Sequence, residues 1–427
     1  MYTLFGLFGF LLAVATAEKY AMVLSTDNDW ETYYISSESC RVYDTLVKGG
    51  IKPENIILLT RTDVVKKQEN PFPGMVFTDP APDTSGDWAQ YGCFDHIDYS
   101  GKDVNKEIIL GIISGDVDAV AKATGKENPK VLSAGPEDTV FTYFIGNGGA
   151  GYISIGIDML SSKELSDAIK SAYDKKLYGK WVWFMEACFA GSMFYSVSED
   201  WNVYAMTASD THHMSYMNWC PPYDVVAEKS FGTCLAGLWD NLFLEYLQQH
   251  PTTTIGELYK DVKAAIKPKT DQNVYECGDL SFKDLPLSDF VGVIPASYST
   301  RKVGIGSIVS VDAVPRHLAM WEVIRADKNE LKNAMNEYER IVKAEAKKEV
   351  EVMRLGVALM NEKGAAVAMR VSAESYSIDC VRDLSLGLVK NCGHSIPMSE
   401  KTMNLLRSIC LPGLSTPEVN WSDICME

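Results

Sequence analysis

The chain has 427 residues, of which 46% are hydrophobic and 23% are charged, a composition typical of globular proteins and a length sufficient for two domains. Its formal net charge of −17 and its pI near 4.9 argue against binding to nucleic acid or to an anionic membrane surface. An acidic compartment would suit the chain, because protonation of its carboxylates relieves their mutual repulsion.

The first residues are typical of a secretory signal peptide. Leu4 to Val14 forms an apolar core, and Ala15-Thr16-Ala17 provides a small-residue cleavage site. No Lys or Arg precedes the core, so the alternative is a short membrane anchor, but the run is short for a bilayer and no second run follows. We therefore predict a signal peptide at 1–17 and a soluble protein of the secretory pathway, either lysosomal, vacuolar or secreted.

Strands and helices alternate along the first two thirds of the chain. Strands are predicted at 20–25, 55–60, 139–145, 181–185 and 202–207, and helices at 36–49, 106–113, 161–175, 234–249 and 254–266. Residues 70–101 are rich in Pro, Gly and Asp and predict a long surface excursion. The order of elements predicts an α/β fold with a parallel sheet. Because sites in such sheets lie beyond the carboxyl ends of the strands, the exits at 146–151, 188–192 and 209–214 should share one rim.

One strand exit carries a candidate nucleophile. The apolar run Trp181 to Met185 ends in Glu186-Ala187-Cys188, and small residues follow directly. A tight turn after a central strand holds a cysteine rigidly beside free backbone N–H groups, as a nucleophile requires. The alternative is a buried structural cysteine, which is the commoner role of a single Cys.

The last part of the chain has a helical pattern. Leu331, Met335, Tyr338 and Val342 recur at a 4-3-4 spacing, which predicts one face of a helix. Further helices are predicted at 353–360, 371–388 and 401–411. This pattern indicates a separate small helical domain.

Ten cysteines suit an oxidising route, in which disulfides form. The four in the last fifty residues predict two local bridges, and Cys220 with Cys234 would close one loop. The sequence leaves open whether Cys40, Cys93 and Cys277 are free. No close C-x-x-C pair occurs, so we predict no metal site and no cofactor.

Several further stretches occur in a recognisable order: Asn70-Pro-Phe-Pro-Gly74, Asp98-Tyr-Ser-Gly-Lys-Asp103, Gly135-Pro-Glu-Asp138 and Glu186-Ala-Cys-Phe-Ala-Gly-Ser-Met193. Together they resemble the legumain family of asparaginyl endopeptidases. The resemblance implies a caspase-like, mostly parallel central sheet flanked by helices, followed by an all-helical prodomain stapled by Cys380–Cys410 and Cys392–Cys425. The implied division is a signal peptide at 1–17, a peptidase domain at 18–285, a linker or activation segment at 286–328 and a prodomain at 329–427.

By resemblance, such proteins are made as zymogens whose prodomain covers the active site and is removed in acid. The segment 325–329 lies near the expected processing site, with Asp327 and Asn329 as candidate cut points. The alternative is that these two residues only begin a helix.

The chain departs from the family at the catalytic base. Where active members end the third strand with Asp-His-Gly, this chain has Gly146-Asn147-Gly148. Asparagine cannot take the thiol proton of Cys188, and losing an acid–base partner typically costs ~10²–10⁴-fold in rate. The backbone N–H of Gly148 is still expected to serve an oxyanion hole. His212 and His213 follow the fifth strand on the same rim and are candidates for a substitute base.

The specificity pocket departs as well. By resemblance its Arg, Glu and Asp positions hold Tyr34, Phe189 and Leu238. These replacements predict an apolar pocket that has lost the polar groups used to select Asn.

Three functions remain. The first is a catalytically impaired pseudoenzyme that binds a peptide or protein ligand in its cleft, such as a protease inhibitor or an active legumain, besides its own prodomain. The second is an active lysosomal or vacuolar cysteine endopeptidase with an altered base and an apolar P1 preference. The third is a secreted or cell-surface interaction protein whose prodomain is never removed. Cleavage of a peptide library that depends on Cys188 would separate the second from the others.

Overall fold

The computed structural model describes residues 17–26, 29–61, 63–80, 92–156, 158–295, 305–369, 375–395, 397–413 and 415–426. The predicted signal peptide therefore lies almost entirely outside the described residues, as does the middle of the predicted excursion at 70–101. Among the described residues, no helix is long and apolar enough to cross a membrane.

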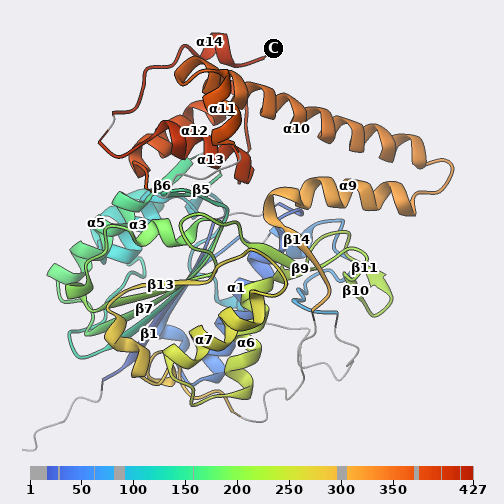
Figure 1. The fold of residues 1–427 in the computed structure, drawn as a ribbon. Helices are drawn as coiled ribbons and strands as arrows, with labels where there is room; N and C mark the ends of the chain where they lie inside the picture. The colour runs from blue at the N-terminus through green and yellow to red at the C-terminus, as the bar shows by residue number, and fades with distance from the viewer. Residues whose placement is uncertain are drawn as a thin grey trace, which may run out of the picture.

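A six-stranded sheet of order β13-β8-β7-β3-β1-β2 forms the centre of the protein (Figure 1). Its strands are β1 (Lys19–Ser25), β2 (Ile56–Leu59), β3 (Thr139–Ile145), β7 (Lys180–Glu186), β8 (Val203–Thr207) and β13 (Tyr275–Gly278). All neighbours pair in parallel except β13, which runs antiparallel to β8. The predicted mostly parallel sheet is confirmed, and each of its five predicted strands forms within two residues of its expected bounds.

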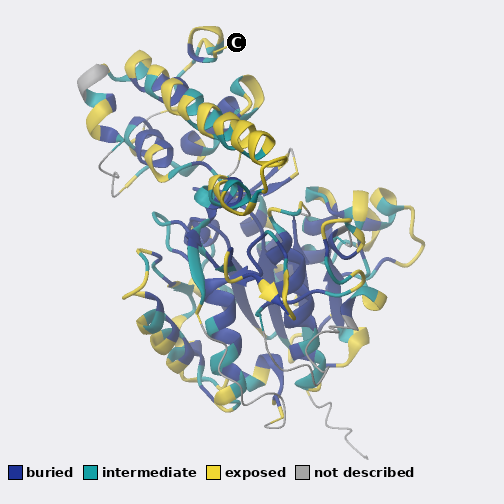
Figure 2. Ribbon diagram, turned by 90° about the vertical axis from the view of Figure 1, so that its right-hand side faces the viewer, coloured by how far each residue is buried: buried dark blue, intermediate teal, exposed yellow. Residues whose placement is uncertain are grey.

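Helices cover both faces of this sheet and create two apolar cores. One face packs against α1 (Tyr33–Lys48), α6 (Leu238–Gln249) and α7 (Ile255–Ile266). The other packs against α3 (Lys106–Ser114), α4 (Val117–Thr124) and α5 (Ser162–Asp174). Because both faces are covered, the strands are apolar runs rather than alternating patterns. Figure 2 shows the sheet buried and the helices exposed on their outer sides.

Local sequence signals explain several helix ends. Ser161 accepts a hydrogen bond from the Glu164 N–H, and the Glu164 carboxylate accepts one from Ser161 N–H in return. This capping box starts α5, at the first residue of the helix predicted over 161–175. Thr254 and Glu257 form the same arrangement at α7.

The predicted helix at 234–249 was wrong at its start. Ala236–Gly237 forms β12 in a small sheet with β9 (Tyr216–Cys220) and β14 (Ser307–Ser310), and α6 begins only at Leu238. The cause is the Cys220–Cys234 disulfide, which holds the chain against β9 before the helix starts. Further short elements are α2 (Asp63–Lys66), α8 (Ser288–Val291), the hairpin β10 (Val225–Val226) and β11 (Lys229–Ser230), and the sheet β4 (Gly148–Gly149), β5 (Tyr152–Ile155) and β6 (Asp158–Ser161).

The C-terminal part is helical, as predicted. It comprises α9 (Val314–Arg325), α10 (Leu331–Leu359), α11 (Glu362–Ala368), α12 (Ile378–Cys392), α13 (Glu400–Ile409) and α14 (Trp421–Ile424). The disulfides Cys380–Cys410 and Cys392–Cys425 are both present, and Cys40 pairs with Cys93. Helices α9 and α10 form a hairpin that projects sideways from the other C-terminal helices (Figure 1).

Two features of this part go beyond the sequence interpretation. The residues predicted to form one apolar helix face do lie on α10. Leu331, Met335 and Val342 are exposed, however, so this face buries little apolar surface. The segment 286–328, predicted as a linker, contains α8, β14 and α9, and β14 pairs with β9. The candidate processing segment lies in the exposed turn between α9 and α10, where Asp327 accepts hydrogen bonds from the N–H groups of Asn329 and Glu330.

Candidate active site

Strand β7 delivers Cys188 to the rim of the sheet. The strand ends at Glu186, and the turn after it is held by the Ser209 hydroxyl, which donates to Ala187 O and accepts from Ala190 N–H. Phe189, next to the cysteine, has a left-handed backbone with φ 56° and ψ 23°. Such a conformation is uncommon for a bulky residue and is typical of sharp turns at functional sites. The turn therefore presents Cys188 as a nucleophile elbow would.

The sulfur of Cys188 has no basic hydrogen-bond partner in the described chain. Its hydrogen-bond partners in the described chain both belong to Ser215, with Oγ at 3.6 Å and the backbone N at 3.4 Å. Cys188 is 1% exposed, and burial raises the pKa of its thiol to about 12, although the Ser215 hydrogen bonds act in the opposite direction. In this closed arrangement the thiol is protonated.

Backbone geometry around Cys188 suits an oxyanion. The Cys188 N–H makes no hydrogen bond within the described residues. Gly148 lies directly opposite, since a Cβ added there would be 2.3 Å from the Cys188 carbonyl oxygen. Only glycine fits this approach, so the backbone of residue 148 lies against the turn that carries Cys188, and the Cys188 N–H is a donor available to an oxyanion.

The structure brings two predicted positions together beside the cysteine. Asn147 precedes β4, is 5% exposed, and accepts a hydrogen bond from the Tyr34 hydroxyl at 3.3 Å. Tyr34 reaches this point from α1. Asn147 is therefore held by Tyr34, and its amide cannot remove a proton.

The other two predicted pocket positions are both buried and lie on separate elements. Leu238 is the first residue of α6. Phe189 packs against Arg407 of the C-terminal helices, whose guanidinium carbon lies 4.8 Å from the centroid of the Phe189 ring.

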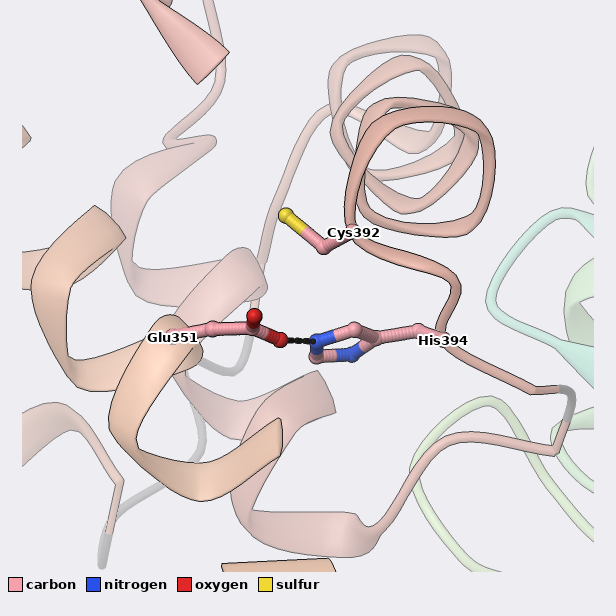
Figure 3. A group of neighbouring side chains, drawn as sticks. All are labelled: Glu351, Cys392 and His394. Atoms are coloured by element: carbon pink, nitrogen blue, oxygen red, sulfur yellow. Dashed lines mark hydrogen bonds and ion pairs between the residues drawn. The ribbon is translucent and has the colours of Figure 1, made fainter. Parts of the chain in front are cut away.

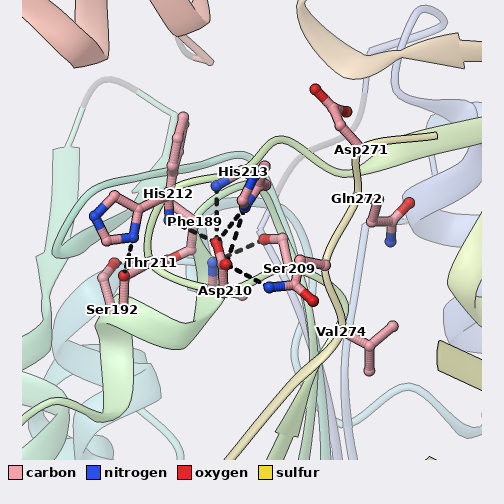
Figure 4. A network of polar contacts seen from close by, with 12 residues as sticks. Phe189, Ser192, Ser209, Asp210, Thr211, His212, His213, Asp271, Gln272 and Val274 are labelled. Atoms are coloured by element: carbon pink, nitrogen blue, oxygen red, sulfur yellow. Dashed lines mark hydrogen bonds and ion pairs between the residues drawn. The ribbon is translucent and has the colours of Figure 1, made fainter. Parts of the chain in front are cut away.

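Neither histidine on the neighbouring loop reaches the sulfur. The His213 ring binds the Asp210 carboxylate at 2.8 Å, and the His212 ring contacts the Thr211 hydroxyl at 2.7 Å (Figure 4). The hydrogen bond with His213 lowers the pKa of Asp210 to about 2 against the opposing effect of burial, and the same bond raises the pKa of His213. The pair fixes the loop, and neither ring contacts Cys188.

Sequence reasoning missed a set of buried carboxyl groups near the cysteine. Glu186, Asp240 and Glu38 come from β7, α6 and α1, and none is more than 1% exposed. The Tyr143 hydroxyl donates to Asp240 Oδ1 at 2.8 Å, whereas Asp240 Oδ2 and both oxygens of the two glutamates lack a partner in the described residues. The signal was present, because a glutamate ends an otherwise apolar strand.

Burial governs how these carboxyl groups titrate. It raises the pKa of Glu186 and of Glu38 well above the usual value and that of Asp240 to about 7. Ser215, which contacts the Cys188 sulfur, acts in the opposite direction on Glu186. Burial thus favours the protonated form of all three carboxyl groups, and Asp240 titrates near neutral pH.

A second cluster, in the C-terminal helices, is a structural pair. His394 Nε2 lies 2.9 Å from Glu351 Oε2, and the Met426 N–H donates to the other oxygen (Figure 3). Cys392 is nearby, but its sulfur is bonded to Cys425. The thiolate that a metal would need is therefore absent while the disulfide is intact.

The C-terminal helices pack on the rim that carries Cys188. Ile378, at the start of α12, fills the space above Gly151, where an added Cβ would be 2.0 Å from its Cγ2 atom. The Tyr376 hydroxyl and the Arg407 guanidinium both donate to Thr211 O, at 3.0 and 2.8 Å. These contacts place the C-terminal helices against the turns that follow β7 and β8.

Comparison with known proteins supplies a family. Residues 19–293 match the Peptidase C13 family. A vacuolar-processing enzyme of Vicia sativa is 30% identical over 284 residues, which are 65% of this chain and 56% of that protein. Legumain of Mus musculus is 35% identical over 199 residues, which are 47% of this chain and 44% of that protein. The chain thus spans about half the length of these two relatives.

Two further likenesses have lower identity, and the first of them extends along nearly the whole chain. The vacuolar-processing enzyme delta-isozyme of Arabidopsis thaliana is 24% identical over 425 residues, 95% of this chain and 89% of that protein. A caspase-1 structure from Spodoptera frugiperda aligns with 61% of this chain and 86% of its own at 10% identity and a TM-score of 0.34. The fold described above rests on its own strand order and not on this structural likeness.

Proposed function

The chain belongs to the peptidase C13 family, the legumain family, and from that premise we propose that it is a catalytically impaired member that binds a peptide or protein ligand in its cleft. The observation that carries the proposal is the environment of the nucleophile. The only hydrogen-bond partner of the Cys188 sulfur in the described chain is Ser215, and the base position is occupied by Asn147, which accepts from Tyr34.

The arithmetic of thiol ionisation supports this proposal. With a thiol pKa of about 12 in the closed chain, roughly 10⁻⁷ of the molecules carry a thiolate at pH 5. Opening of the cleft restores an ordinary pKa near 8.5 and a thiolate fraction of ~0.03%, still without a base. Efficient turnover is therefore not expected in either state.

The C-terminal helices act, in this proposal, as a prodomain that competes with the ligand for the rim. Their contacts at Gly151 and Thr211 support this role. The exposed turn at 326–330 is the proposed processing segment. The disulfides are consistent with the secretory pathway, with a lysosome or vacuole or the exterior as the destination.

The alternative is an active endopeptidase with an altered base and an apolar P1 preference. The Cys188 N–H without an acceptor and the apolar Phe189 and Leu238 favour this alternative. It requires a group that accepts the thiol proton, and the side chain nearest the sulfur is the Ser215 hydroxyl.

A cleavage assay tests the proposal. The purified full chain is incubated at acidic pH and then assayed on a diverse peptide library beside Cys188→Ala. We expect no cleavage beyond that of the alanine variant, and Cys188-dependent cleavage would establish the alternative.

A gain-of-function variant probes the cleft itself. Asn147→His places an imidazole where the base belongs, and we expect Cys188-dependent cleavage to rise about 10²-fold or more, the usual contribution of a positioned base. Asn147→Gln is the control that alters the side chain without a titrating group. No gain with histidine would contradict the view that only the base is missing.

A further inference from the structure

A single arginine of the C-terminal helices is bound at the rim of the cleft. Arg407, on α13, is fully buried. Its guanidinium carbon lies 4.8 Å from the centroid of the Phe189 ring and 5.3 Å from that of Tyr376. One terminal nitrogen donates to Thr211 O at 2.8 Å and the other to His212 O at 3.4 Å. The group is thus recognised by an aromatic face and by two carbonyl oxygens.

These partners belong to two different parts of the chain. Phe189 and the carbonyls of Thr211 and His212 lie on the turns that follow β7 and β8, beside Cys188. Tyr376 belongs to the C-terminal helices, as does Asn404, whose side-chain oxygen accepts from Arg407 at 3.3 Å. The rim alone therefore offers one ring and two acceptors to a guanidinium.

The rim side of this contact is rigid. The left-handed backbone of Phe189 is held by its N–H, which donates to His213 O, and by its carbonyl, which accepts from the Ser192 N–H and hydroxyl. Asp210 accepts from the N–H groups of His212 and His213 and from the Asn273 amide, and this arrangement aims the two carbonyls (Figure 4). A site whose groups are already fixed loses little entropy when a ligand binds.

The chemistry of this rim selects a guanidinium rather than an ammonium. Planar guanidinium stacks on a ring and presents a fork of N–H donors, whereas lysine offers a compact and strongly hydrated charge. Burial lowers the pKa of the Arg407 guanidinium, and the nearby Tyr376 and Asp210 act in the opposite direction. A chain of net charge −17 also attracts a basic partner over long range.

We infer that Phe189 and the carbonyls of Thr211 and His212 form an arginine-binding subsite next to Cys188, which Arg407 fills in the closed chain. When the C-terminal helices move off the rim, this subsite binds an arginine side chain of a basic peptide or protein segment. The inference rests on the proposed function in that it names the ligand class of the same cleft. Its test below needs no cleavage and no removal of the helices.

The experiment empties the subsite in the full chain. Arg407→Ala leaves the ring and the carbonyls in place, and ethylguanidinium is the probe, with ethylammonium at the same ionic strength as the comparison. Binding is measured by calorimetry and by the shift of the thermal transition. We expect Arg407→Ala to bind ethylguanidinium about fivefold or more tightly than ethylammonium, and the wild type to bind neither at the same concentrations.

Matched variants locate the binding. Arg382→Ala removes an arginine of α12 that pairs with Asp379 and Asp383, and it should gain no guanidinium binding. Phe189→Leu added to Arg407→Ala should abolish the preference for guanidinium, because the ring is lost. Equal binding of both probes, or the same gain with Arg382→Ala, would overturn the inference.

Two further measurements keep the test decisive. N-acetylarginine amide and N-acetylcitrulline amide have the same shape and differ in charge, so Arg407→Ala should bind only the former. If Arg407→Ala does not fold alone, ethylguanidinium present during refolding should restore the fold where ethylammonium does not, and failure of both would count against the subsite. None of these readouts depends on whether Cys188 cleaves peptides, so the two proposals fail separately.

Discussion

Replacing Asp240 by asparagine measures how the buried acids beside the active site affect stability. The Asp240 side chain is fully buried, its Oδ1 accepts from Tyr143, and its Oδ2 has no partner in the described residues. Asparagine keeps the acceptor for Tyr143 and nearly the same volume, and it removes the charge. The new amide can also donate towards Glu186, because a Cβ added at Gly237 would meet both the Asp240 Oδ2 atom at 2.1 Å and the Glu186 carboxyl carbon at 3.5 Å.

The size of the effect follows from titration. Burial raises the pKa of Asp240 from 3.8 to about 7, a difference of about 3.2, and at about 1.4 kcal/mol for each pH unit this corresponds to about 4 kcal/mol. The folded-state pKa is the higher one, so the folded chain retains a proton that the unfolded chain loses above pH 4. The free energy of unfolding therefore falls as the pH rises from about 4 to about 7.

Urea denaturation at pH 4.5 and 7.5, with the disulfides intact, tests this reasoning. We expect Asp240→Asn to be more stable than the wild type at pH 7.5 by up to about 4 kcal/mol and to differ little at pH 4.5. The control Asp167→Asn removes an exposed charge of α5, which pairs with Lys163, and should change stability by less than about 1 kcal/mol at both pH values. If the free energy of unfolding of wild type and of Asp240→Asn changed in parallel with pH, the raised pKa of Asp240 would be refuted as the cause.

Two further predictions concern the C-terminal helices. Burial lowers the pKa of His394 despite its hydrogen bond with Glu351, so this histidine contributes stability above its unfolded pKa of 6.5 that is lost as the pH falls through the folded value. When the pH is lowered from 7.5 to 5, hydrogen exchange of α10 and α12 should accelerate after correction for intrinsic rates. His394→Gln should reduce this acceleration. The same acceleration in the variant as in the wild type would contradict the role of His394. Replacing both Cys392 and Cys425 by serine opens a loop whose ends are 33 residues apart in sequence. The free energy of unfolding of these helices should fall by roughly 3–4 kcal/mol, measured by urea denaturation with hydrogen exchange as the readout. A loss below about 1 kcal/mol would show that packing alone holds α14.

Acid thus acts in opposite directions on the two parts of the chain. The carboxyl group of Asp240 stabilises the sheet region when it is protonated, whereas protonation of His394 destabilises the C-terminal helices. A fall in pH would therefore destabilise the C-terminal helices through His394 and stabilise the packing of α6 through Asp240.

The sequence alone determined the order of the elements and the place of the nucleophile. The strands of the main sheet were predictable because each is a short apolar run bounded by turn residues, and α5 because its capping box is local. Cys188 was recognisable because it directly follows such a run. The resemblance to legumains also supplied the two C-terminal disulfides, which the structure contains.

Only the tertiary structure decided which groups surround Cys188. Ser215 lies 27 residues away in the chain, Asp240 meets Tyr143 across 97, and Arg407 reaches Thr211 across 196. No local pattern specifies such pairs, because they depend on which faces of distant helices and strands pack together. Local hydrophobic periodicity therefore indicated where the cysteine stands. Long-range packing decided that its sulfur meets Ser215 and that Arg407, from the far end of the chain, lies over the adjacent Phe189.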